Sequence, residues 1–524
     1  MRNIKDLLQG INIGIAVGLA LSENPENTLE LYKNIMSASI LPSKELTNNY
    51  TNFLKEHASE KFKNEDFNTA VLEYLDIFKN ADMEPEEYRN TAICLLKLNQ
   101  KDAAIEFLKK YEECAPNNPE IHKNIGLIYF NMLEDYQMAI EHFEKYVKIV
   151  QSDPEIYNVL GHLYSLHHKD KQLKKQLEYF MHAYRLRKNT RLYIRNVIFT
   201  LFRLDEYEQV EEFYQKLLKL NPTHSDYYYY GCFLISQNKI AEGYKYLSHR
   251  FEKEDGDKSI IPAVLPTEKL WHGEDLTGKT ILVHCEQGFG DSILYSRFVK
   301  DISKKAKKVY FIVQEELFSL MNNSNLGAEI YSTAFELSRL DYDYFTTTVE
   351  LAAYQKFTAE KIPYNKGYLR AIPINLTSDN LKIGFAYKGS NLLKSCERDI
   401  KDLSELFKLK DCQLYSLQVD GDLTLPDNVI DLGKDFKSFE DTANAIMAMD
   451  IIISTDNAIL NLAGALGKKT LGVFNRFPEY RWINLCDKKE TCWYNSVLAF
   501  QNKKQDDWEP TLKRITDYIK EGFL

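Results

Sequence analysis

The sequence predicts an α + α/β chain, in which an N-terminal array of helical repeats precedes two domains built on parallel sheets. Prolines at Pro85, Pro119 and Pro154 are spaced by 34 and 35 residues, and Pro222 follows after 68 more, which is two further periods. Beyond about residue 279, short apolar runs alternate with helical segments instead. That alternation is typical of parallel sheets covered by helices.

The residues within one period match two helices that pack closely. Gly126 lies one turn before an aromatic position and is followed by Ala139 and Phe143, so a small residue lets the first helix approach the second while an aromatic ring fills the groove. We expect about six such units over residues 47–254, after an N-terminal helical segment, 1–46. Stacked units leave a concave face that usually holds a partner protein.

Charge and cysteine content narrow the class of protein. The 524 residues carry a net charge of −10 without a basic block, which argues against a nucleic-acid or anionic-membrane surface. Eight scattered cysteines without a C-x-x-C pair fit reduced, buried thiols in a cytoplasmic protein. The apolar run at 11–21 is too short to span a bilayer, and we expect a buried first helix rather than a signal peptide. No transmembrane segment is expected.

A change in composition marks the end of the repeats. Residues 255–278 are charged, then punctuated by prolines, and predict a linker. Two Rossmann-like domains are expected after it, over 279–378 and 379–524.

A glycine turn follows the first strand of the first domain. The strand begins at Thr280, and Gly288 and Gly290 then allow a sharp bend and the close approach of backbone to a ligand. Asp291 lies where the next helix begins. The full dinucleotide fingerprint is absent, so the alternative of Asp291 as a helix cap stays open.

The second domain places polar residues after three predicted strands. Lys388 follows the first strand, Gln418 the second, and Asp456 the strand at 450–455. Ligands of parallel sheets bind at these carboxyl ends. The segment from Asp456 through Ala458 also opens a helix, whose amides suit a diphosphate. An ordinary β–α unit with Asp456 as its N-cap is the alternative.

These motifs together carry a family resemblance. EQGFGDSILYSRF, LYSLQ, FEDTANAIMAMDIIISTDNAILNLAGALGK and RFPEYRW occur in this order in the C-terminal half. With the repeats, they resemble bacterial tetratricopeptide-repeat glycosyltransferases, whose catalytic half is similar to the ADP-heptose heptosyltransferases. The resemblance implies a GT-B fold, with an acceptor side in the first Rossmann-like domain, a nucleotide-sugar side in the second, and neither a cofactor nor a metal ion.

The resemblance also implies roles for individual residues. Asp291 becomes the candidate general base, which fits a reaction that must deprotonate an acceptor hydroxyl. The donor side is expected to neutralise the charge of a departing nucleoside diphosphate. Its candidate residues are Lys388 near the phosphates, Gln418 near the nucleoside, and Asp456, Asn457 and Ala458 around the sugar and diphosphate.

Three positions depart from the family pattern. Asn457 and Asn461 stand where relatives have threonine and histidine, and Asn461 cannot titrate near neutral pH. Lys388 stands where relatives often have a small residue. These departures fit an enzyme that uses a different sugar donor, or a protein that binds a nucleotide sugar without catalysing its transfer.

Three functions therefore remain open. The main hypothesis is a metal-independent glycosyltransferase that acts on a protein or glycan acceptor held by the repeats. The alternatives are a nucleotide-sugar-binding scaffold without turnover and a repeat-based adaptor. The sugar, the nucleotide, the acceptor and homo-oligomerisation are left open.

Overall fold

The computed structural model describes residues 25–38, 44–168, 172–252, 265–286, 288–355, 357–389, 399–483 and 489–523. The apolar run at 11–21 and the start of the expected linker, 255–264, lie outside these ranges. The chain divides into two compact units, Met1–Val210 and Glu211–Leu524.

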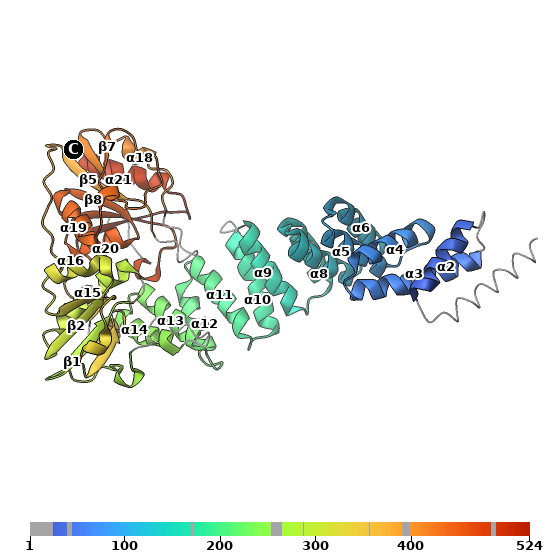
Figure 1. Cartoon of the computed structure of the whole chain (residues 1–524), viewed down its shortest axis with the longest axis horizontal. Coiled ribbons are helices and arrows are strands. Elements are labelled where there is room, and N and C mark those ends of the chain that lie inside the picture. Colours follow the sequence, from blue (N-terminus) through green and yellow to red (C-terminus); the bar gives the residue numbers. More distant parts are fainter. Residues whose placement is uncertain are drawn as a thin grey trace, which may run out of the picture. The chain divides into compact units, whose positions relative to one another are not determined.

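The first unit is helical and resembles a tetratricopeptide solenoid. Consecutive helices pack in pairs, α3 on α4, α5 on α6, α7 on α8 and α9 on α10 (Figure 1). The described helices are α2 (Pro25–Ala38), α3 (Lys44–Lys63), α4 (Phe67–Asn80), α5 (Pro85–Lys97), α6 (Lys101–Cys114), α7 (Pro119–Ile128), the π-helical turn η1 (Tyr129–Leu133), α8 (Tyr136–Ile149), α9 (Pro154–His168), α10 (Leu173–Leu186), α11 (Arg191–Arg203) and α12 (Tyr207–Leu217), which spans the unit boundary.

The repeated prolines begin helices. Pro85, Pro119 and Pro154 are the first residues of α5, α7 and α9. At this position proline loses no hydrogen bond, because the first amides of a helix have no partner within it. The prediction that prolines mark the repeat period is confirmed at these sites.

Residues with a left-handed backbone repeat at nearly the same period. Glu65, Asn99, Glu134, Asp205 and Asn238 all have φ between 54° and 62°. Each lies in the turn between two helices, where a left-handed residue reverses the chain. The repeat is therefore encoded in the turns as well as in the helix starts.

Close helix packing depends on small residues at the predicted positions. A Cβ added at Gly126 would lie 2.7 Å from the Phe143 ring, and one at Gly161 would lie 2.4 Å from Phe180. Both distances are shorter than any real contact. Glycine thus allows α7 and α9 to touch the aromatic rings of α8 and α10.

The second unit begins with a last helical pair, α13 (His224–Ser236) and α14 (Ile240–Leu247), followed by η3 (Ser248–Glu252). The Tyr244 hydroxyl lies 2.6 Å from that of Tyr295 in the first α/β domain, and the Tyr244 ring also contacts Trp493. This pair therefore packs on the sheet domains and belongs to the same compact unit.

The first sheet has four parallel strands in the order β3-β2-β1-β4. Part of the expected linker covers it, since Trp271 is buried and its amide donates to the carbonyl of Phe345. The elements are β1 (Thr280–His284), α15 (Phe289–Ile302), β2 (Lys308–Val313), α16 (Phe318–Asn323), β3 (Glu329–Ser332), β4 (Tyr344–Thr347) and α17 (Glu350–Ala353).

The second sheet has seven strands in the order β10-β11-β9-β8-β5-β6-β7, all parallel except β10. Counted from β5 and without β10, this is the order 3-2-1-4-5-6 of a dinucleotide-binding sheet. The elements are β5 (Leu381–Ala386), α18 (Ser404–Phe407), β6 (Cys412–Ser416), β7 (Val429–Asp431), α19 (Phe439–Ala448), β8 (Ile451–Thr455), α20 (Ala458–Ala465), β9 (Thr470–Phe474), β10 (Lys489–Glu490), β11 (Val497–Gln501) and α21 (Glu509–Gly522).

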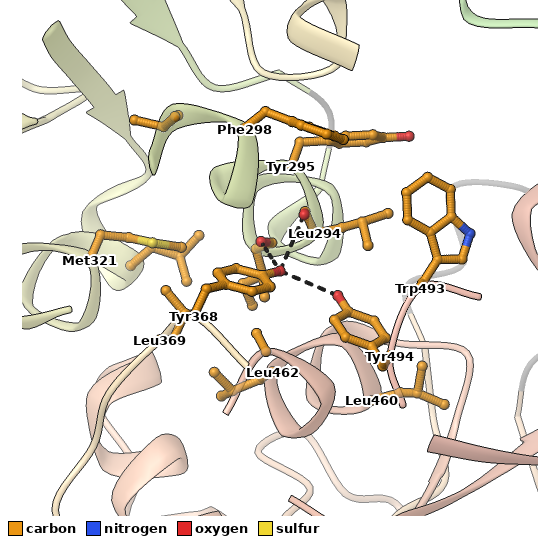
Figure 2. Close-up of a cluster of buried hydrophobic side chains, with 14 of the residues drawn as sticks. Leu294, Tyr295, Phe298, Met321, Tyr368, Leu369, Leu460, Leu462, Trp493 and Tyr494 are labelled. Atoms are coloured by element: carbon orange, nitrogen blue, oxygen red, sulfur yellow. Dashed lines mark hydrogen bonds between the residues drawn. The ribbon is translucent and has the colours of Figure 1, made fainter. Parts of the chain in front are cut away.

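Helices α15 and α20 join the two sheet domains through a continuous apolar core. In Figure 2, Tyr368 from the connecting segment lies between side chains of both helices. Its hydroxyl donates to the carbonyl of Ile293 at 2.7 Å and lies 3.5 Å from the hydroxyl of Tyr494 (Figure 2). Arg297 is fully buried beside it and donates to the carbonyl of Trp493 at 2.8 Å. These contacts hold α15 against α20.

Two expectations about exposure can be compared with the structure. The described cysteines are free, and Cys94 and Cys285 are buried as predicted. Cys114 is exposed, so the prediction is wrong there, because this residue ends α6. Within the described ranges, every helix is too short or too polar to cross a membrane.

Candidate functional site

The order of the second sheet brings two of the predicted loops together. Strands β5 and β8 are neighbours, and chain connections leave them toward opposite edges of the sheet. Such a reversal point is where parallel sheets bind ligands. Lys388 follows β5 and Asp456 follows β8. The side chain of Asn457 joins the two loops, since its Nδ2 donates to the carbonyl of Lys388 at 3.1 Å.

Asn457 is also the N-cap of α20. Its Oδ1 accepts from the amide of Leu460 at 3.0 Å and from the hydroxyl of Ser454 at 2.9 Å. The alternative that Asp456 caps this helix is therefore wrong, because the helix starts one residue later than that alternative requires. The amides of Ala458 and Ile459 precede the first bond within the helix and point out of its end.

Gln418 shapes the loop after β5. Its Oε1 accepts from the amides of Tyr387 and Lys388, at 3.2 and 3.0 Å, and its Nε2 donates to Asp420 at 2.7 Å. The side chain is nearly buried. A role beside a nucleoside stays a prediction, and the observed contacts make Gln418 a support for the Lys388 backbone.

The Lys388 ammonium is held by acidic neighbours. It donates to the Asp422 carboxylate at 3.2 Å and to the carbonyl of Asp420 at 3.3 Å. The hydrogen bond to Asp422 raises the pKa of Lys388 above its ordinary value. The ammonium therefore stays charged at neutral pH, and an incoming phosphate would compete with Asp422 for it.

Both polar atoms of the Asn461 side chain have protein partners. Its Nδ2 donates to the carbonyl of Asn457 at 3.0 Å, and its Oδ1 accepts from the Tyr494 hydroxyl at 3.1 Å. Asn461 thus ties α20 to the segment before β11. These contacts explain why an amide, which donates and accepts at once, suits this position.

The glycine turn of the first domain lies directly against the start of α20. A Cβ added at Gly290 would be 3.2 Å from Nδ2 of Asn461 and 3.6 Å from Cα of Ala458. Gly288 is the N-cap of α15, and Asp291 follows in the first turn. The structure therefore brings the turn that carries Asp291 next to the start of α20, the helix that follows Asp456. The alternative of Asp291 as the cap of α15 is wrong.

Asp291 forms an ion pair that the sequence analysis missed. The Arg481 guanidinium contacts Oδ1 of Asp291 through Nη1, and its Nε donates to Glu479 at 2.8 Å. Burial raises the pKa of Glu479, with the Arg481 charge opposing that shift. Both residues belong to the motif RFPEYRW, which is part of the family resemblance. The resemblance assigned no role to either charged residue.

The reversal point of the first sheet, between β1 and β4, is occupied by an arginine of η3, the short helix after the last helical pair. Arg250 donates to Glu286 at 2.8 Å and to Glu350 at 2.9 Å, and all three side chains are buried. Glu286 follows β1, and Glu350 begins α17 just after β4. The sequence could have indicated Glu286, because it is a charged residue just after an apolar strand. It could not have indicated the partner, Arg250, because that residue is distant in the chain.

The D-x-D sequence at 341–343 lies at the other end of the first sheet. Asp343 accepts from the amide of Thr280, the first residue of β1, at 2.8 Å and pairs with Lys279 at 2.9 Å. The amino ends of parallel strands point away from the usual ligand edge. Asp343 is therefore explained as a strand-end contact.

Comparisons with known proteins give a distant relative. No family model matches the sequence. Protein FlbA of Caulobacter vibrioides is 23% identical over 332 residues, covering 55% of this chain and 54% of FlbA. The chain thus spans about half the length of the curated relative it matches.

Solved structures of MamA match part of the chain. MamA from Desulfovibrio magneticus RS-1 is 20% identical, covering 32% of this chain and 94% of that structure, with a TM-score of 0.28. Another crystal structure of MamA is 16% identical, covering 41% and 98%, with a TM-score of 0.26. These scores are low, so the description of the repeats rests on the helix pairs, turns and glycines above.

Proposed function

We propose that this chain is a glycosyltransferase that uses a nucleotide sugar and holds a macromolecular acceptor with its helical repeats. The observation that carries the proposal is the meeting of the Gly288–Asp291 turn with the start of α20 at the reversal point of the second sheet. The proposal is supported because the turn that carries the Asp291 carboxylate lies next to the start of α20, and Asn457 joins that start to the Lys388 loop. Glycosyl transfer needs these groups.

Each group has a task in the proposed reaction. The acceptor hydroxyl oxygen attacks the anomeric carbon of the sugar while the bond from that carbon to the diphosphate oxygen breaks. Asp291 accepts the hydroxyl proton, and the electron pair leaves with the nucleoside diphosphate. The amides of Ala458 and Ile459, together with Lys388, stabilise the charge that develops on the diphosphate.

Arg481 has a positioning role in this proposal. Its ion pair uses Oδ1 of Asp291, so the acceptor hydroxyl would approach Oδ2. The guanidinium is itself held by Glu479. A base fixed in this way needs little reorganisation when substrate binds.

The test starts with donor binding. The purified chain is heated with ADP-, UDP-, GDP- or CMP-linked sugars, and a donor that binds the native state raises the melting temperature. Lys388→Met should reduce the shift, whereas Lys410→Met, at an exposed lysine of the same domain, should leave it unchanged. Absence of a shift with every donor would count against a nucleotide-sugar site.

Release of nucleoside diphosphate from the selected donor then tests catalysis. The second candidate function is a scaffold that binds through its repeats without turnover. It is favoured by the protein contacts of Asn457 and Asn461, which already satisfy their side chains. Donor binding without release of nucleotide, in the presence of acceptor-containing lysate fractions, would support the scaffold.

A further inference from the structure

A cluster of two histidines and a glutamate lies in the first unit, whereas the residues of the candidate site belong to the second. Glu112 is on α6, His122 on α7 and His142 on α8, so each comes from a different helix of two successive repeats. One ligand atom from each lies within 4.8 Å of the others. Both histidines are buried, and Glu112 is partly exposed.

The separation of the two rings suits a shared ion. Nδ1 of His122 lies 3.3 Å from Nδ1 of His142. Two nitrogens bound at about 2.0–2.1 Å to one tetrahedral zinc ion are about 3.3 Å apart. The Glu112 carboxylate is 3.8 Å from Nδ1 of His122, close enough for a small side-chain rotation to complete the set.

A neighbouring carbonyl orients the first histidine. Nε2 of His122 lies 2.8 Å from the carbonyl of Pro116, which can only accept, so the ring proton resides on Nε2. Nδ1 of His122 then carries a lone pair directed at His142. Metal-binding histidines typically have their second nitrogen fixed by a carbonyl or carboxylate in this manner.

We propose that Glu112, His122 and His142 bind a divalent transition-metal ion of the zinc type. Without metal, His142 donates its Nδ1 proton to Nδ1 of His122. The ion replaces this shared proton, and His142 carries its proton on Nε2 instead. Lys145, which donates to the same Glu112 oxygen at 2.8 Å, is half exposed and can turn into solvent.

The bound ion would join two repeats. Three helices from consecutive pairs would share one centre, with a fourth position left for water. Since a metal that binds only the folded state stabilises it, the first unit should unfold at a higher temperature when the ion is present. This role is independent of sugar transfer in the second unit.

Cobalt absorption tests the site directly. The full chain is treated with EDTA, dialysed and titrated with Co²⁺, whose visible d–d bands report tetrahedral or five-coordinate nitrogen and oxygen ligands. We expect saturation at about one ion per chain and displacement by Zn²⁺. Absence of these bands, together with absence of Zn²⁺ binding by calorimetry, overturns the proposal, as does a thiolate charge-transfer band that assigns the ion to cysteine.

Variants identify the ligands. Glu112→Gln, at a partly exposed position where folding should survive, is expected to weaken binding at least about tenfold, and His142→Gln to abolish it. The matched control is His224→Asn. His224 and His249 form a second histidine pair with Nδ1 atoms 3.4 Å apart, outside the described metal-ligand group. Loss of the ion in His224→Asn but not in Glu112→Gln overturns the assignment.

Discussion

The Arg481 guanidinium contacts the carboxylate of Asp291, which comes from the other sheet domain and lies 190 residues earlier in the chain. The pair joins the first turn of α15 to the segment after β9. A residue proposed as the general base is therefore positioned by the second sheet domain. Catalytic geometry would depend on how the two domains pack, and the Tyr368 and Arg297 contacts maintain that packing.

Asp291→Asn should keep donor binding and lower the rate of transfer by at least ~100-fold, because a positioned general base contributes ~10²–10⁴. Nucleotide release and donor-induced thermal shift are measured on the same preparation. Asp301→Asn, on the same helix, serves as the control and should keep the full rate. A rate for Asp291→Asn within a few-fold of the unmodified chain removes Asp291 from the proposed role.

Sugar transfer should persist in excess EDTA. The D-x-D sequence is a strand-end contact, and the metal site proposed for the repeats lies in the other unit. Asp343→Asn should likewise keep activity while losing some stability. Loss of activity on chelation, with rescue by Mg²⁺ or Mn²⁺, would contradict a metal-free reaction.

Arg250→Met should lower the free energy of unfolding of the second unit by about 3–5 kcal/mol, because it leaves Glu286 and Glu350 as uncompensated buried carboxylates. Chemical denaturation measures the change. Lys279→Met removes the exposed, solvent-screened ion pair with Asp343 and should change the free energy of unfolding far less. Equal changes in the free energy of unfolding would show that the buried triad contributes no more to stability than the exposed pair.

Gly126→Ala should destabilise the first unit by about 1–3 kcal/mol, since the new methyl group overlaps the Phe143 ring. Phe143→Leu costs stability by itself but relieves this overlap. In a double-mutant cycle the combined loss should be smaller than the sum of the single losses. Additive losses would mean that the helices separate without involving Phe143.

The second unit should lose stability as the pH falls below about 6.5, in part through His284. Burial lowers the pKa of His284, against the opposing effect of its hydrogen bond to the carbonyl of Cys285. As the pH falls, the unfolded state therefore binds a proton that the folded state does not. The free energy of unfolding decreases by up to about 1.4 kcal/mol per pH unit.

His284→Gln removes this proton uptake, so its free energy of unfolding should depend less on pH between 7 and 5 than that of the unmodified chain. His272→Gln, at an exposed histidine, is the control and should retain the full dependence. Parallel pH profiles for all three proteins would exclude His284 as a source of the acid sensitivity.

Local sequence patterns were sufficient to predict much of the fold. The strand expected to begin at Thr280 does begin there, as β1 (Thr280–His284), and the strand expected at 450–455 is β8 (Ile451–Thr455). Their apolar residues and the turns beside them are contiguous in sequence, and so are the helix starts marked by proline. Strand β11 and helix α21 were not predicted individually, because the last motif in the sequence, RFPEYRW, ends at Trp482.

For the candidate site too, some features follow from local sequence and others depend on the tertiary structure. The sequence by itself determined that Asp291, Lys388 and Asp456 each follow a strand, because strand ends are set by neighbouring residues. Only the tertiary structure decided that the Asn457 side chain joins the Lys388 loop and that Arg481 meets Asp291. A charge or an amide can have many partners within reach of its chain position, and the packing of distant faces selects one of them.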